Sequence, residues 1–339
     1  MSEPLKLGLV GAGAIAQSYT KAMEDCTFAR LVGIADTRVE AAAAAAESMG
    51  CDSYASHQEM AEKSGCEAVI VCTPPSTHSE IATYFIDRGL PVLCEKPLST
   101  DTASARALCE AAESKGVILA MASKFRYVED VIRARSIITS GLVGDVILME
   151  NAFASSVSME RRWNSDPKVS GGGVLIDNGT HSVDIVRYLL GPIVDILAVE
   201  GKRIQDIPVE DSANLFVHTE SGATAHIDLS WSLNKDLDTF IRVYGTDGTI
   251  LIGWQESRYK QKSSADWVVF GQGYNKFSAF EGQIRNFCNR IQGTEPLLIS
   301  NEDAIASVEV IQAAYTSLKQ GGWVTINGPD AVPRSTTAA

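Results

Sequence analysis

The sequence is poor in positive charge and contains no long apolar run. Its 339 residues carry 29 lysines and arginines against 42 aspartates and glutamates, a formal net charge of −13. Sequence-independent binding to nucleic acid or to anionic lipid needs clustered basic side chains, so this balance argues against both partners. No apolar stretch approaches the roughly 18–20 residues that a membrane-spanning helix requires. We therefore expect a soluble protein with neither a nucleic-acid nor a membrane partner.

Cysteine and histidine are also sparse, and their spacing is not that of a metal site or a disulfide framework. None of the seven cysteines lies in a C-x-x-C pair, their number is odd, and several sit in apolar runs such as VIVC and PVLC. The five histidines are scattered, so no metal is expected. Reduced, buried thiols and an N-terminus without the apolar core of a signal peptide predict a cytoplasmic protein.

The first 123 residues alternate short apolar runs with segments of helical periodicity. The runs are LKLGLV, ARLVGIAD, EAVIVCTP, PVLCEKP and VILAMAS. Apolar strands that alternate with helices form βαβ units, in which a parallel sheet is buried on both faces. The length of the chain suits two domains. We therefore predict an α/β domain with a parallel sheet over residues 1–123.

The pattern changes after this point. Helices are predicted at 128–139, near 181–190, at 280–291 and at 301–320, with a series of strands in between. SG at 221–222 and TDG at 246–248 are typical of hairpin turns, and consecutive hairpins make an antiparallel sheet. This predicts an α+β domain for substrate binding and oligomerisation over residues 124–327, followed by a flexible tail over 328–339.

The motif GAGAIA at residues 11–16 follows the first apolar run and opens a predicted helix. In a G-x-G-x-x-A turn, Gly11 allows the tight bend, Gly13 lets the backbone approach a pyrophosphate, and Ala16 allows close helix–strand packing. The N-terminus of the helix, with Ala14 and Ile15 in its first turn, favours the phosphate charge. The motif predicts that the first domain is a Rossmann domain that binds a dinucleotide.

The second apolar run ends in Asp36, about 20 residues after the glycine motif. A carboxylate there bonds the adenosine ribose hydroxyls and repels a 2′-phosphate, which favours NAD. Arg38 could stack on adenine or tolerate a phosphate, so NADP stays open as an alternative. We expect Asp36, Thr37 and Arg38 to lie beside the adenosine half of the cofactor.

Two later strand ends also carry polar residues, and in a doubly wound sheet these ends face the ligand crevice. The stretch VCTPPSTH at 71–78 brings Thr73 and Pro74 to the cofactor, while His78 is either a cofactor contact or a helix-start residue on the rim. The stretch CEKPLS at 94–99 brings Glu95 and Lys96 to the same crevice. A lysine there can hold a developing alkoxide by charge or donate a proton.

The stretch DNGTH places Asp177 and His181 four residues apart, after the glycine run 171–173. Asp177 fits the N-cap of a helix that begins near it, and one helical turn would set both side chains on one face. His181 suits the removal of a hydroxyl proton because the unperturbed pKa of histidine is about 6.5. Asp177 could orient that imidazole or bind substrate, and Asn178 could bond the substrate or the backbone.

Together these motifs resemble the successive signatures of the Gfo/Idh/MocA family, named for glucose–fructose oxidoreductase and inositol dehydrogenase. The resemblance covers nearly the whole chain, and EKP at 95–97 and D-x-x-x-H at 177–181 are its most specific parts. It implies a Rossmann domain followed by a domain with a large, mainly antiparallel open sheet, through which a homodimer or homotetramer forms. It also implies NAD(P)-linked oxidation or reduction of a sugar, an inositol or a sugar derivative.

By motif position, the resemblance implies a catalytic set of Lys96, Asp177 and His181, with Lys96 holding the reacting oxygen and His181 as general base or acid. It places Arg126 and Tyr127 near the cleft, although both could be a surface pair at a helix entry. It also suggests Trp163 beside the nicotinamide, although a packed surface tryptophan fits as well. The predicted substrate-binding residues are Lys96, Arg126, Tyr127, Trp163, Asp177, Asn178 and His181. The predicted cofactor-binding residues are Gly11, Gly13, Ala14, Ile15, Asp36, Thr37, Arg38, Thr73, Pro74, His78, Glu95 and Lys96.

Two alternatives keep the same cofactor site. A non-catalytic NAD(P)-binding regulator of this fold would have no need of Lys96 or His181, and both are present. An NAD-dependent glycosidase or an aldose–aldose oxidoreductase would recycle a tightly bound cofactor without net NADH release. The leading prediction is a dehydrogenase acting on a small carbohydrate or polyol.

Overall fold

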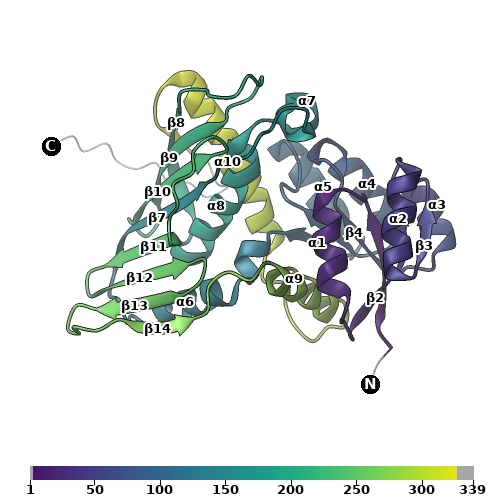
Figure 1. The fold of residues 1–339 in the computed structure, drawn as a ribbon, viewed down its shortest axis with the longest axis horizontal. Coiled ribbons are helices and arrows are strands. Elements are labelled where there is room, and N and C mark those ends of the chain that lie inside the picture. Colours follow the sequence, from purple (N-terminus) through teal and green to yellow (C-terminus); the bar gives the residue numbers. More distant parts are fainter. Residues whose placement is uncertain (1–2, 327–339) are drawn as a thin grey trace.

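The computed structural model describes residues 3–326, which form two lobes side by side (Figure 1). The predicted tail at 328–339 lies outside the described residues. One lobe contains the N-terminal sheet and its helices, and the other is dominated by a second, larger sheet. The predicted order of an α/β domain followed by an open-sheet domain is confirmed.

Within residues 3–326, the first lobe is built on a six-stranded parallel sheet of order β3-β2-β1-β4-β5-β6. Its strands are β1 (Leu5–Val10), β2 (Ala29–Ala35), β3 (Asp52–Tyr54), β4 (Ala68–Val71), β5 (Val92–Glu95) and β6 (Leu119–Ala122). The strand order reverses between β1 and β4, so the carboxyl ends of these two strands open onto the ligand crevice of a Rossmann fold.

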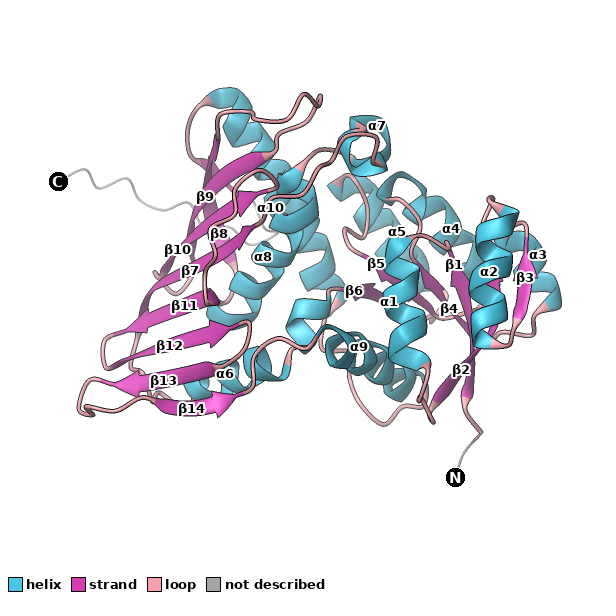
Figure 2. Ribbon diagram, in the orientation of Figure 1, coloured by secondary structure: helices cyan, strands magenta, loops and turns pink. Residues whose placement is uncertain are grey.

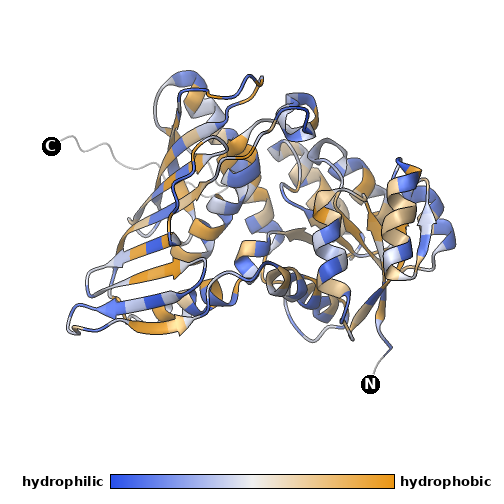
Figure 3. Cartoon of the chain, in the orientation of Figure 1, coloured by the Kyte–Doolittle hydropathy of each residue, from blue (hydrophilic) through white to orange (hydrophobic). Residues whose placement is uncertain are grey.

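Helices cover both faces of this sheet, and its strands are therefore largely apolar, as in β4 (AVIV) and β6 (LAMA) (Figure 3). The helices are α1 (Ala14–Met23), α2 (Val39–Met49), α3 (His57–Lys63), α4 (His78–Ile86) and α5 (Thr102–Ser114). One core cluster joins the sheet to α1 and α2, and a second joins it to α3, α4 and α5 (Figure 2). Two short 3-10 turns, η1 (Pro75–Thr77) and η2 (Lys124–Tyr127), follow β4 and β6.

The second lobe contains, within the described residues, a nine-stranded sheet of order β14-β13-β12-β11-β7-β10-β9-β8-β15. Its strands are β7 (Val146–Ala154), β8 (Ile193–Glu200), β9 (Ser212–Thr219), β10 (Thr224–Ser230), β11 (Thr239–Gly245), β12 (Gly248–Gly253), β13 (Ser257–Gln261), β14 (Val268–Gly271) and β15 (Val324–Thr325). The pair β7–β10 is parallel and the other neighbours are antiparallel, so the sheet is mainly antiparallel as predicted.

One face of this sheet packs on helices and the other is open, because its strands alternate apolar and polar residues. In β9, for example, Leu215 and Val217 are buried, while Asn214 and Phe216 point to the open face. The remaining helices are α6 (Glu129–Thr139), α7 (Pro167–Ser170), α8 (Val174–Leu190), α9 (Lys276–Ile291) and α10 (Asn301–Gln320), and η3 (Trp163–Ser165) precedes α7. Across residues 3–326, none of the helices combines the length and apolarity that crossing a bilayer demands.

The prediction that Asp177 caps a helix is wrong, because α8 begins at Val174 and its N-cap is Gly173. A distant carboxylate replaces the local cap: Glu210 Oε1 accepts hydrogen bonds from the backbone N–H groups of Gly173 (3.0 Å) and Leu175 (3.1 Å). A negative charge at a helix N-terminus also suits the helix dipole. Asp177 therefore lies within the first turn, with its side chain free to reach across the lobes.

Helix α9 returns the chain to the first lobe. Phe280, Ile284 and Phe287 are buried in the cluster that contains Leu7 and Tyr19 of the Rossmann core. Figure 1 shows α9 beside α1, far from the strands that precede it in sequence. The proposed division into residues 1–123 and 124–327 stays a prediction, and the packing assigns α9 to the first core.

Candidate active site

A cavity of about 330 Å³ lies where the two lobes meet. The Rossmann lobe contributes residues from the end of β5, from η2 and from the start of α1, and the other lobe contributes residues from β7 and α8. The lining residues are Ile15, Glu95, Lys96, Lys124, Phe125, Phe153, Ala154, Ser155, Asp177, Asn178, His181, Trp254 and Phe280. The cavity thus begins at the predicted dinucleotide loop and extends to the predicted catalytic residues.

The turn after β1 has the shape that a pyrophosphate needs. Gly11 has a φ of +98°, and a Cβ there would lie 2.9 Å from the carbonyl oxygen of Cys72, so only glycine fits. A Cβ at Gly13 would meet nothing within 4 Å, so the space beside this N-cap of α1 is open to a ligand. Ala14 is exposed in the first helical turn. These residues fit the phosphates of a dinucleotide.

Asp36 follows β2 and holds the same turn in place. Its carboxylate accepts hydrogen bonds from the backbone N–H of Ala12 (2.7 Å) and from Arg38 (2.8 Å to the backbone N–H). Burial raises the pKa of Asp36, but the hydrogen bonds from Arg38 and Ala12 outweigh it, so the pKa lies below its usual value. The carboxylate is therefore ionised, and Thr37 and Arg38 are exposed beside it.

His78 starts α4 and is held between two loops at the ends of neighbouring strands. The side chain is fully buried, and its two ring nitrogens lie 2.8 Å from the carbonyl oxygens of Pro97 and Thr73. It thus ties the loop after β4 to the loop after β5. His78 does start a helix, but it is buried and not on the rim, and its role as a cofactor contact stays a prediction.

Lys96 and Asp177 form an ion pair across the lobes. The Nζ atom of Lys96 donates to Asp177 Oδ1 at 2.6 Å and to the carbonyl oxygen of Asp177 at 2.8 Å. Glu95, next to Lys96, is buried and accepts from the hydroxyl of Tyr19 at 2.7 Å. Burial raises the pKa of Glu95. Asp177 thus pairs with Lys96, while the sequence left its role open between orienting the imidazole of His181 and binding substrate.

His181 lines the cavity but is only 7% exposed. Its Nδ1 atom lies 3.4 Å from Ser123 Oγ, and its ring meets Phe125 edge-on at a centroid distance of 5.0 Å. Burial lowers the pKa of His181 well below 6.5, and the charges of Lys96 and Lys124 add to this effect. The imidazole is therefore neutral near neutral pH and can accept a proton.

Lys124 is a cavity residue that the sequence reasoning missed. Its ammonium group lies 5.2 Å from the ring centroid of Phe125 and 5.6 Å from that of Phe280. Burial and then the charge of Lys96 lower its pKa to about 8. Lys124 follows β6, so the rule that strand ends face the crevice could have found it. Phe153, Trp254 and Phe280 also line the cavity, and their local sequence carries no such signal.

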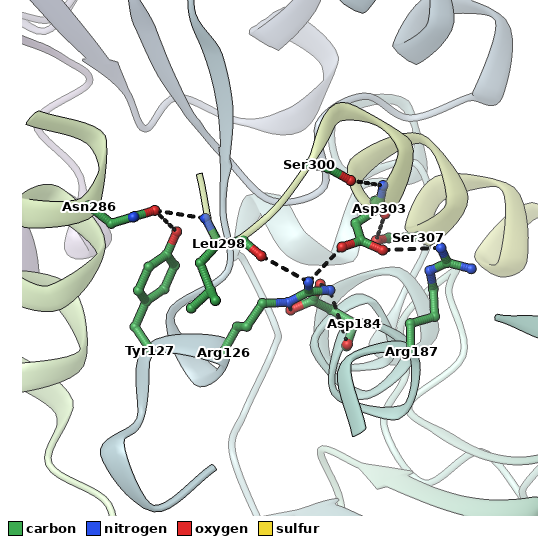
Figure 4. Close-up of polar contacts among 9 residues, drawn as sticks. All are labelled: Arg126, Tyr127, Asp184, Arg187, Asn286, Leu298, Ser300, Asp303 and Ser307. Carbon is green, nitrogen blue, oxygen red and sulfur yellow. Dashed lines mark hydrogen bonds and ion pairs between the residues drawn. The ribbon is translucent and has the colours of Figure 1, made fainter. Parts of the chain in front are cut away.

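Three predicted substrate contacts lie outside the cavity lining. The guanidinium group of Arg126 is buried between Asp184 and Asp303, at 2.5 Å and 2.6 Å (Figure 4). The hydroxyl of Tyr127 donates to Asn286 at 3.1 Å. Trp163 is 45% exposed on η3. Ion pairs and a hydrogen bond thus engage Arg126 and Tyr127 outside the cavity lining, and their contact with substrate stays a prediction, whereas Asn178 lines the cavity.

Comparison with known proteins gives the same assignment to both lobes. Residues 5–123 match the model of an oxidoreductase family with an NAD-binding Rossmann fold, and residues 131–251 match the GFO/IDH/MocA C-terminal domain. The chain is 26% identical to an inositol 2-dehydrogenase from Rhizobium meliloti (strain 1021), over 95% of this chain and 99% of that protein. It is 30% identical to a D-glucoside 3-dehydrogenase from Escherichia coli (strain K12), over 94% of this chain and 97% of that protein.

Solved structures agree with this assignment. GenD2 from gentamicin A biosynthesis, solved in complex with NAD, is 27% identical with a TM-score of 0.86, over 97% of this chain and 98% of that chain. Levoglucosan dehydrogenase, solved with NADH and levoglucosan, shares the fold with a TM-score of 0.89 at 21% identity, over 96% of this chain and 100% of that chain. The predicted resemblance is confirmed, and the chain belongs to the GFO/IDH/MocA family of oxidoreductases with an NAD-binding Rossmann domain.

Proposed function

We propose that the protein oxidises a secondary hydroxyl of a sugar, an inositol or a sugar derivative with NAD, and reduces the ketone in reverse. The observation that carries this proposal is the convergence of Lys96 and neutral His181 on one cavity beside the dinucleotide turn. Removal of hydride from a carbinol carbon needs a base for the hydroxyl proton and a cation near the oxygen. The base, His181, and the cation, Lys96, come from different lobes.

The residues of the dinucleotide turn and the end of β2 support NAD as the cofactor. Gly11, Gly13, Ala14 and Ile15 would hold the pyrophosphate at the N-terminus of α1, and ionised Asp36 would bond the ribose hydroxyls. The same carboxylate would repel the 2′-phosphate of NADP, although exposed Arg38 beside it could offset part of that repulsion. Thr73 and Pro74, after β4, would flank the cofactor. When bound, NAD supplies the acceptor for the hydride.

The chain's own groups perform the proton chemistry. His181 Nε2 takes the hydroxyl proton, while the Lys96 ammonium stabilises the oxygen as negative charge develops on it. Asp177 keeps Lys96 in place through the 2.6 Å ion pair. In the direction of ketone reduction, protonated His181 returns the proton.

The cavity suits a small hydroxylated ring. Phe153 and Trp254 offer apolar surfaces, and Ser155 and Asn178 offer hydrogen-bonding groups in the same lining. The relatives named for inositol and glucoside dehydrogenation act on such rings. We propose that the substrate is of this size and chemistry.

The test is NADH formation by the purified protein with NAD and a panel of inositols, aldoses, glucosides and uronic acids. Steady NADH release with at least one of them, abolished by His181→Ala, supports the proposal. A tightly bound cofactor that is reduced once without net release would favour a recycled-cofactor enzyme. NAD binding without turnover on any member would favour the non-catalytic regulator.

We also propose that the open face of the second sheet joins copies of the chain into a homodimer or homotetramer. Val199 is 50% and Phe216 40% exposed there, and the two belong to neighbouring strands. Exposed apolar side chains on an open sheet are typical of interfaces. Sedimentation of the wild type against Phe216→Glu tests this, and a wild-type monomer would contradict it.

A further inference from the structure

A buried chain of polar groups lies behind His181, on the side away from the cavity. Arg126 Nη2 donates to Asp184 Oδ1 at 2.5 Å, and Arg126 Nε donates to Asp184 Oδ2 at 3.3 Å (Figure 4). The Asp184 carboxylate also forms a hydrogen bond with Ser123, whose Oγ lies 3.4 Å from His181 Nδ1. Ser123 and Asp184 are fully buried. The groups run in series from Arg126 to the imidazole.

The direction of each hydrogen bond in this series follows from chemistry. A guanidinium group only donates and an ionised carboxylate only accepts, so the hydroxyl hydrogen of Ser123 must point to Asp184. The Ser123 oxygen then offers a lone pair to His181, and the matching partner is a protonated Nδ1. A neutral imidazole carries one proton, so Nε2 is left as the acceptor.

The series depends on an ionised Asp184. Burial raises its pKa, but the contacts with Arg126 and Ser123 act against that rise. Arg126 keeps its positive charge at any working pH, since the pKa of arginine exceeds about 12. A neutral Asp184 would leave that buried guanidinium with Asp303 as its remaining carboxylate. The geometry therefore favours the ionised form.

We propose that Ser123 and Asp184 are positioning residues that hold His181 in its Nδ1–H tautomer, so that Nε2 faces the cavity as the proton acceptor. This inference rests on the proposed role of His181 as the base. Among residues 3–326, Nε2 has no hydrogen-bond partner, and His181 lines the cavity. The other charged groups around the imidazole are Lys96, Lys124 and Asp177, and none of them contacts Nδ1. When His181 is protonated, the same Nδ1–H bond persists and the ring keeps its place.

Nuclear magnetic resonance of the full-length protein with isotope-labelled histidine tests the tautomer directly. The chain has five histidines, and the His181 signals are those lost in His181→Gln. We expect the Nδ1–H tautomer in the wild type at neutral pH, and a mixture or the Nε2–H tautomer in Ser123→Ala. An Nε2–H tautomer in the wild type, or an unchanged tautomer in Ser123→Ala, would overturn the inference.

Kinetics provide a second measurement. We expect Ser123→Ala to lower kcat roughly 10-fold with little change in KM, because a misplaced base loses part of the 10²–10⁴-fold that acid–base catalysis contributes. Ser123→Thr keeps the hydroxyl and should restore most of kcat. In Asp184→Asn the amide oxygen would accept from Arg126 and the amide N–H₂ would donate to Ser123. The Ser123 hydroxyl would then donate to His181 Nδ1, which favours the wrong tautomer. We expect kcat to fall further in this variant than in Ser123→Ala.

Ser317→Ala is a matched control, since Ser317 is also fully buried but bonds Ala198 and Gly322 far from the cavity. Its kcat should stay at the wild-type value. If His181→Ala abolishes turnover while Ser123→Ala matches the wild type in kcat and tautomer, this inference fails and the proposed function stands. If His181→Ala stays fully active, the proposed function itself fails.

Discussion

Replacing Arg126 by methionine separates a structural role from a substrate-binding role. The side chain is 2% exposed, and its loss would leave the fully buried carboxylate of Asp184 without its cation. Breaking a buried ion pair from one side costs about 3–5 kcal/mol. Asp303 loses less, because Arg187 still donates to it at 3.1 Å. Most of the lost stability therefore comes from the unpaired carboxylate of Asp184.

The loss of stability in Arg126→Met can be expressed as a shift in melting temperature. At about 2.1 cal/mol/K per residue, the unfolding entropy of a chain of this length is near 0.7 kcal/mol/K, so a loss of 3–5 kcal/mol lowers Tm by about 4–7 °C. Differential scanning fluorimetry at neutral pH measures this shift. The control is Arg106→Met, whose ion pair with Glu309 is 42% exposed on the arginine side. Exposed pairs contribute about 0–1 kcal/mol, so the control should shift Tm by less than about 1.5 °C.

The shift should also depend on pH in a defined direction. Without Arg126, the pKa of Asp184 in the folded protein rises further above that of the unfolded chain, so the folded state binds more protons. The variant then gains stability as the pH falls through the folded pKa, and its Tm deficit should narrow in acid. An unchanged Tm at neutral pH together with a raised KM would refute the reasoning and restore Arg126 as a substrate ligand.

Three further predictions concern the cavity and the cofactor turn. Lys96→Ala and His181→Ala should each lower kcat by at least about 10²-fold while the Kd for NAD, measured by calorimetry, stays within a factor of a few, because both act on the reacting oxygen; wild-type kcat in either would contradict their roles. Asp36→Ala should weaken the binding of NAD more than that of NADP, because the lost carboxylate accepts from the ribose hydroxyls of NAD and repels the 2′-phosphate of NADP. An unaltered NAD/NADP preference in paired kinetics would count against this. Lys124→Met should raise the pKa of His181, because it removes a nearby positive charge. The acid limb of kcat/KM against pH should then move to higher pH, and a limb at the wild-type position would show that Lys124 does not act on His181.

The parts of the molecule that local patterns specify were predictable from the sequence. The apolar runs identify the Rossmann strands because both faces of that sheet are buried. Lys96 could be predicted because it follows a strand, and the carboxyl ends of these strands face one crevice. Lys124 obeys the same rule and was overlooked beside the more familiar motif residues. Asp177 was paired with His181 by its four-residue spacing, whereas its partner is Lys96 in the other lobe.

The errors share a physical cause, which is a partner distant in sequence. The start of α8 could not be predicted because its N-terminal N–H groups bond Glu210, which is distant in sequence. The N-cap residue itself, Gly173, has no side chain that could signal a helix start. The family resemblance places Arg126 near the cleft, but motif position does not reveal that it pairs with two carboxylates. Its partners, Asp184 and Asp303, reach it only through the packing of α8 and α10. Trp254 reaches the cavity through the register of the second sheet, which short motifs do not encode.

The return of α9 to the first lobe has a consequence for how the chain folds as it is synthesised. Phe280, Ile284 and Phe287 pack in one core cluster with Leu7 and Tyr19, and Gln283 donates to the Tyr19 hydroxyl at 2.9 Å. The ribosome makes the chain from its N-terminus at about 5–20 residues per second, so the apolar surface that α9 covers lacks its partner until residues 276–291 have emerged. The nascent Rossmann half therefore lacks part of its core until α9 is made. A fragment cut after residue 123 would lack these side chains and leave the apolar surface that they cover exposed to water.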